Sequence, residues 1–125
     1  MKTKIYSQHG EHMEWQNKLS FYKDEIKVME KRIAEVSQKN TGIEVRKEIE
    51  HFQNQFLIQK ENIRRISHHI SEEEKQIQSE VKKNPVASDH RETEDHAKER
   101  DMVTNFETNF NELRRECNTF LSKRL

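Results

Sequence analysis

Five residues of this sequence combine imidazole and carboxylate groups at helical spacings. His69 and Glu73 are four positions apart, and His96 and Glu99 are three apart, so each pair lies on one face of a helix. His12 adds a third imidazole near the start of the chain. Zn, Fe and Mn bind such nitrogen and oxygen donors when facing helices bring them together. These five residues therefore predict a metal site, with Fe or Zn as the metal, provided that the fold unites them.

Three stretches with apolar residues at alternating steps of four and three must position these side chains. In the first stretch seven successive positions are apolar: Trp15, Leu19, Tyr22, Ile26, Met29, Ile33 and Val36. The pattern recurs from Val45 to Ile77, with Gln59 and Glu73 as polar members, and from Val103 to Phe120. This is the heptad pattern of helices that pack side by side at a shallow angle.

Two breaks divide the helices. Gly42 can take the left-handed conformation that ends a helix, and Thr41 with Glu44 fits a capping box that starts the next one. Pro85 ends the second helix, because the residue before proline disfavours the helical region. We predict a flexible N-terminus over 1–6 and one domain over 7–125, with helices at about 7–40, 41–84 and 88–125.

The predicted fold is all-α: an elongated three-helix antiparallel up-down-up bundle with coiled-coil-like heptad packing. Short turns between helices of similar length make sequential neighbours antiparallel. The alternative is a long coiled coil that assembles only as an oligomer.

Folding the chain about its turns brings the predicted ligands to one end of the bundle. Position 12 of the first helix comes level with about position 70 of the second and about position 102 of the third. The match follows from the places of the two turns, because all three helices advance at the same ~3.6 residues per turn. His12, Glu73, His96 and Glu99 then share one height and point inward, while His69 flanks them. Alternatively, these polar residues form a solvated bundle end with no ligand.

Two short segments resemble a known family. His68-His69-Ile70-Ser71-Glu72-Glu73 and Asp95-His96-Ala97-Lys98-Glu99 look like helix segments of hemerythrin-like cation-binding bundles. The resemblance implies a metal-binding bundle with His69, Glu73 and His96 as ligands by match. It departs in helix number, because those bundles use four helices and this sequence predicts three.

Composition narrows the classes of function. Of 125 residues, 30% are hydrophobic and 37% are charged, and 23 basic residues balance 23 acidic ones. A basic excess typical of nucleic-acid binding is absent, so we expect no nucleic-acid or membrane partner. Cys117 is the only cysteine, and residues 1–6 lack an apolar signal core, so we expect a cytoplasmic protein.

Four apolar residues lie off the heptad positions and suggest an interface: Phe21, Val28, Leu57 and Ile58. They form an exposed patch for self-association or another protein, or they widen the apolar face that a three-helix core needs. No phosphate loop, dinucleotide fingerprint or nucleophile elbow occurs. We therefore expect a non-enzymatic interaction or structural module, with a hemerythrin-like or ferritin-like metal-binding bundle as the alternative.

Overall fold

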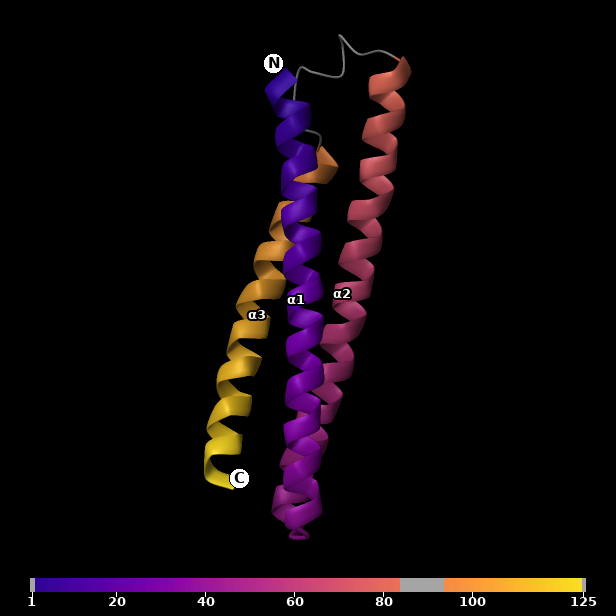
Figure 1. The fold of residues 1–125 in the computed structure, drawn as a ribbon. Helices are drawn as coiled ribbons and strands as arrows, with labels where there is room; N and C mark the ends of the chain where they lie inside the picture. Colours follow the sequence, from indigo (N-terminus) through magenta and orange to yellow (C-terminus); the bar gives the residue numbers. More distant parts are fainter. Residues whose placement is uncertain (1, 84–93, 125) are drawn as a thin grey trace.

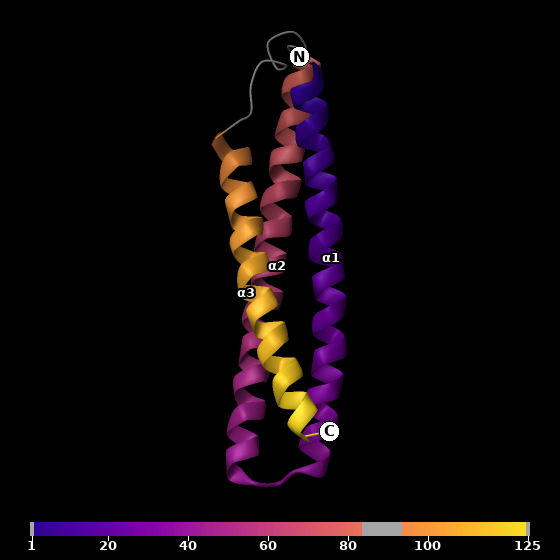
Figure 2. The ribbon, with the colours of Figure 1, turned by 90° about the vertical axis from the view of Figure 1, so that its left-hand side faces the viewer.

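The residues that the structure describes form three long helices in the computed structural model. The structure describes residues 2–83 and 94–124, with side chains at 8–80, 82–83 and 95–124. Helix α1 spans Lys2–Lys39, α2 spans Ile43–Lys83 and α3 spans Glu94–Arg124. They lie side by side along one long axis, as Figures 1 and 2 show. The predicted all-α, elongated three-helix fold is therefore confirmed.

Contacting side chains establish the direction of each helix. As the position in α1 rises from 16 to 30, the partner in α2 falls from 67 to 60. As the position in α1 rises from 11 to 25, the partner in α3 rises from 100 to 114. Hence α2 runs antiparallel to α1, and α3 runs parallel to α1 (Figure 1).

The core consists of the apolar residues at the heptad positions. Every apolar member of the three patterns is buried, with Ile26, Phe56 and Phe110 completely so. Leu121, outside the pattern, is buried as well. Burying a large apolar side chain stabilises the fold by about 1.5–3 kcal/mol. The repeated apolar positions thus hold the three helices in register and determine which polar residues at the bundle end face inward.

The turn between α1 and α2 differs in detail from the prediction. The carbonyl of Gly42 accepts a hydrogen bond of 3.0 Å from the Arg46 N–H, so Gly42 is the N-cap residue of α2 instead of Thr41. Gly42 does not adopt a positive φ. The carbonyl of Val36 is satisfied by the backbone and side-chain N–H groups of Asn40, both at 3.0 Å, so no left-handed residue is needed.

The helix bounds differ from the predicted ones mainly at the N-terminus. Helix α1 begins at Lys2, so its backbone extends into the segment 1–6 that we expected to lie outside the bundle. No glycine or proline interrupts this segment, which therefore continues the helix. The predicted break at Asn84–Pro85 and the predicted start of the third helix at 88 lie outside the described residues.

The residues proposed for an interface are exposed. Phe21, Val28, Leu57 and Ile58 have relative exposures of 50–61%, so they do not widen the core. Val28 lines a groove of about 210 Å³ between α1 and α3, together with Arg114 and Leu121. In the described parts of the chain, no helix has the length and apolar character needed to cross a membrane.

Candidate metal centre

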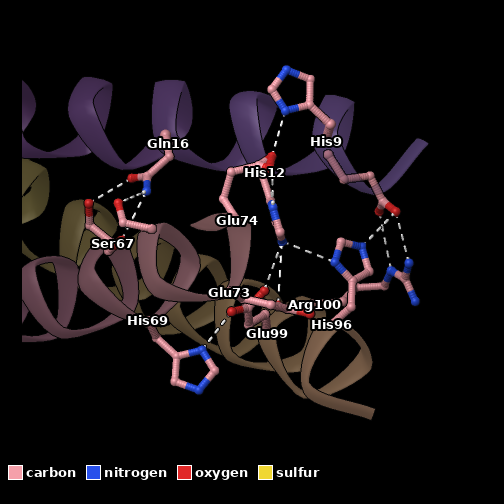
Figure 3. A network of polar contacts seen from close by, with 12 residues as sticks. His9, His12, Gln16, Ser67, His69, Glu73, Glu74, His96, Glu99 and Arg100 are labelled. Atoms are coloured by element: carbon pink, nitrogen blue, oxygen red, sulfur yellow. Dashed lines mark hydrogen bonds and ion pairs between the residues drawn. The ribbon is translucent and has the colours of Figure 1, made fainter. Parts of the chain in front are cut away.

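Four polar side chains meet inside the bundle at the end where α1 begins. His12 comes from α1, Glu73 from α2, and His96 and Glu99 from α3. Their relative exposures are 2%, 5%, 0% and 0%. One potential ligand atom from each residue lies within 4.8 Å of the other three. We call these four residues the His/Glu cluster (Figure 3).

Nε2 of His12 is at the centre of the cluster. It lies 3.0 Å from Oε1 of Glu99, 3.1 Å from Nδ1 of His96 and 3.5 Å from Oε2 of Glu73. The cluster depends on the helix directions, because His12 and Glu99 can meet only if α1 and α3 begin at the same end. It lies at heptad positions, so the same packing that buries the apolar core buries these groups.

The outer nitrogen of His96 contacts a carboxylate. Nε2 of His96 lies 3.1 Å from Oε1 of Glu11. Arg100 donates to both oxygens of Glu11, with N···O distances of 2.9 and 3.3 Å. These ionic hydrogen bonds lower the pKa of Glu11 against the opposing effect of its burial. The Glu11 carboxylate can therefore accept a hydrogen bond from Nε2 of His96, an arrangement that leaves Nδ1 of His96 facing Nε2 of His12.

The outer nitrogen of His12 also contacts a carboxylate. Nδ1 of His12 lies 3.4 Å from Oε1 of Glu74, and the same oxygen lies 2.5 Å from Nδ1 of His9. The His12 side chain is 3% exposed, Glu74 is 19% exposed and His9 is 48% exposed. These three groups connect the cluster to the surface between α1 and α2, as Figure 3 shows.

His69 lies outside the His/Glu cluster and contacts one of its members. Its Nδ1 is 2.6 Å from Oε2 of Glu99, and its side chain is 43% exposed. Glu99 therefore directs one oxygen toward His12 and the other toward His69. In the view of Figure 3, His9 and His69 lie on opposite sides of the cluster.

The charges of the cluster are mutually stabilised. Burial alone would lower the pKa of His12, but hydrogen bonds and charge interactions with Glu99 and Glu74 outweigh it and raise the pKa above 6.5. Burial alone would raise the pKa of Glu99, but hydrogen bonds with the side chains of His12, Glu73 and His69 outweigh it and lower the pKa below 4.5. Without a metal, these interactions favour a proton on His12 beside an ionised Glu99.

Two further residues border the cluster on α1. The ring of Trp15 stacks on His96, with centroids 4.9 Å apart and planes inclined by 30°. Gln8, four positions before His12, is 2% exposed, and within the described chain neither of its amide atoms has a hydrogen-bond partner. The cluster therefore has an aromatic side toward the core and a polar side toward the bundle end.

The structure unites four of the five residues predicted as metal ligands and places the fifth, His69, against one of them. The alternative interpretation, in which these residues form a solvated bundle end, does not hold for the four clustered residues, because they are at most 5% exposed. Sequence reasoning missed the outer partners Glu11, Glu74 and Arg100. Glu11 and Arg100 carry opposite charges and flank the core on parallel helices, and this pattern could have predicted their ion pair.

Comparisons with known proteins return no match: no protein-family model, no curated protein and no solved structure resembles this chain significantly. The likeness to hemerythrin-like bundles thus stays a resemblance of short segments. Among the described residues the four clustered side chains come from three helices, whereas the bundles of that family use four.

Proposed function

We propose that this protein binds one divalent transition-metal ion, Zn²⁺ or Fe²⁺, in the His/Glu cluster. One observation carries the proposal: Nε2 of His12 and Nδ1 of His96 face each other at 3.1 Å, while the outer nitrogen of each ring contacts a carboxylate. Two imidazole lone pairs at this distance repel, so either a proton on His12 or a cation that displaces this proton must lie between the rings. Histidines that bind metals typically have a carboxylate on the outer nitrogen, which orients the ring.

The distances fit a small cation. A tetrahedral ion with bonds of about 2.0–2.1 Å separates its ligand atoms by about 3.3 Å. The separations from Nε2 of His12 to the other three residues are 3.0, 3.1 and 3.5 Å. The four ligand atoms all lie within 4.8 Å of one another, so a central ion would draw the more distant side chains inward.

The charges fit as well. Glu73 and Glu99 bring two carboxylates into a site that is 5% exposed or less. A divalent cation with two carboxylate and two neutral imidazole ligands gives a buried group with no net charge, which reduces the cost of burying the ions. Imidazole and carboxylate together favour Zn²⁺ and Fe²⁺ over Ca²⁺ and Mg²⁺, which prefer oxygen ligands alone.

Metal analysis and thermal unfolding test the proposal. The untagged protein is stripped with chelator and titrated with Zn²⁺, and with Co²⁺ as a spectroscopic probe. We expect one equivalent to bind, intense visible absorption from tetrahedral Co²⁺, and about 2.7 kcal/mol of stabilisation at free Zn²⁺ near 100 times Kd.

Two variants make the test specific. Glu73→Gln keeps the shape of the side chain and should weaken binding strongly, whereas His68→Ala removes an exposed neighbouring histidine and should bind like the wild type. Absence of stoichiometric metal, or equal affinity in the Glu73→Gln variant, would overturn the proposal.

A second candidate function is protein interaction, which the exposure of Phe21, Val28, Leu57 and Ile58 favours. We assign these residues to self-association. The double variant Phe21→Ser/Ile58→Ser should sediment as a folded monomer, whereas the wild type should form dimers. A wild type that is monomeric at high concentration would contradict this assignment.

A further inference from the structure

The ligands of the His/Glu cluster are buried, so a cation needs a route to them. The network reaches the surface at the pair of Glu11 and Arg100 beside His96 and at two partly exposed histidines, His9 between α1 and α2 and His69 on the other side of Glu99. Arg100 places a positive charge at the Glu11 opening, which disfavours entry of a cation there. The two routes past the histidines differ in what lies between solvent and the cluster.

A groove opens on the His9 side. It has a volume of about 410 Å³, and His9, His12 and Glu74 all line it. Because His12 is also a member of the cluster, the groove leads from solvent to the outer side of a ring whose Nε2 faces Glu99 and His96. Met13, which is 55% exposed, lies along the same groove and adds a thioether sulfur.

Glu74 is shared between the surface and the core. Its Oε1 accepts from His9 at 2.5 Å and lies 3.4 Å from Nδ1 of His12. One imidazole and one carboxylate form a weak site for a transition metal, whereas the cluster offers four donors. Lys75 also lines the groove, but its ammonium lies 3.5 Å from the carboxylate of Glu72, which offsets its charge there.

The opposite side is closed by a direct contact. Nδ1 of His69 lies 2.6 Å from Oε2 of Glu99, so the imidazole occupies the oxygen that faces away from His12. A cation arriving there would have to separate this pair, just as a cation arriving on the other side would have to separate His9 from Glu74. Only on the His69 side does the pair include a member of the His/Glu cluster, whose own ligand atom would have to be released.

Resting on the proposed function, we propose that His9 and Glu74 form an outer cation site that captures the metal ion and delivers it through the groove to the His/Glu cluster. The outer site determines how fast the metal enters and leaves, and the cluster determines how tightly it is held. The carboxylate of Glu74 attracts the cation from solution, and its position beside His12 makes the transfer short.

Stopped-flow loading of the metal-free protein with Co²⁺ tests this inference, and His9→Ala is the informative variant. His9 does not touch the cluster directly, so the equilibrium Kd should stay within about threefold of the wild type. We expect the association and dissociation rates to fall together by about tenfold, within the range by which local electrostatics alters such rates.

His69→Ala and His68→Ala are the matched controls, and both should load at the wild-type rate or faster. Slow loading only in His69→Ala would place the route on the other side and overturn the inference. An unchanged association rate in His9→Ala would overturn it too, as would a change in Kd alone. A wild type that takes up no metal ends both proposals, whereas normal uptake with unaltered rates ends only this one.

Discussion

Nε2 of His12 lies 3.0 Å from Oε1 of Glu99, although 87 positions separate the two residues in the chain. The contact is buried, and in the metal-free protein it favours the protonated imidazole of His12 and the ionised carboxylate of Glu99. It is therefore both a stabilising ion pair and a pair of potential metal ligands. Changes of pH, addition of metal and substitution of Glu99 separate these two roles.

The stability of the metal-free protein should be greatest between about pH 4.5 and 6.5. The raised pKa of His12 gives stability that is present below 6.5 and is lost as the pH rises through the folded-state pKa. The lowered pKa of Glu99 gives stability that is present above 4.5 and is lost as the pH falls through its folded-state pKa. Urea unfolding at a series of pH values, in chelator, measures this profile.

The zinc-bound protein should respond oppositely above pH 6.5. Metal binding displaces the proton from His12, so its stabilising effect grows as that proton is lost. The same urea series with saturating Zn²⁺ provides the comparison. If Zn²⁺ does not change how the free energy of unfolding varies with pH above 6.5, His12 is not a ligand.

Removal of Glu99 should strongly destabilise the metal-free fold. Glu99 is fully buried, and its loss leaves the His12 charge without this partner, so Glu99→Ala should cost about 3–5 kcal/mol. Glu99→Gln retains an acceptor and most of the volume, and should cost about 1–3 kcal/mol. Glu72→Ala, at an exposed i,i+3 pair with Lys75, is the control and should stay within about 0.5 kcal/mol in urea unfolding. Equal effects of Glu99→Ala and Glu72→Ala would contradict the role of the ion pair.

Replacement of Gly10 by alanine should stabilise the protein. Gly10 lies within α1, has no positive φ, and a Cβ atom there would meet nothing within 4 Å. Alanine restricts the unfolded chain more than glycine does, so Gly10→Ala should add about 0.5–1 kcal/mol. Thermal unfolding measures the gain, and metal affinity should not change. A loss of stability would show that another group occupies this surface.

Tyr22 should titrate well above an ordinary tyrosine. Burial and the hydrogen bond of 2.7 Å that its hydroxyl donates to Glu107 raise the pKa of Tyr22 from 10.0 to about 12. Ultraviolet titration in a Tyr6→Phe background isolates the signal of Tyr22. A midpoint near 10 in the folded protein would mean that the hydrogen bond to Glu107 does not form. The stability that the Tyr22 proton contributes is present below pH 10 and is lost between pH 10 and 12.

The amino-acid sequence alone determined the three helices and the height of the His/Glu cluster. Apolar residues repeating every three or four positions identify the buried face of each helix, and a helix rises uniformly, so positions joined by turns can be matched in height. The sequence pattern therefore predicts that four residues lie at one height of the bundle: His12, Glu73, His96 and Glu99.

Only the tertiary structure decided how these groups meet. A heptad position specifies the face of a helix, but the direction of a ring nitrogen depends on which neighbours fill the remaining space. The packing of three helices assigned Glu11 and Glu74 to the outer nitrogens of His96 and His12, and placed His69 against Glu99 instead of among the ligands. It also buried the four cluster residues that the sequence alone left open to solvent, because α1 and α2 continue past them to Lys2 and Lys83.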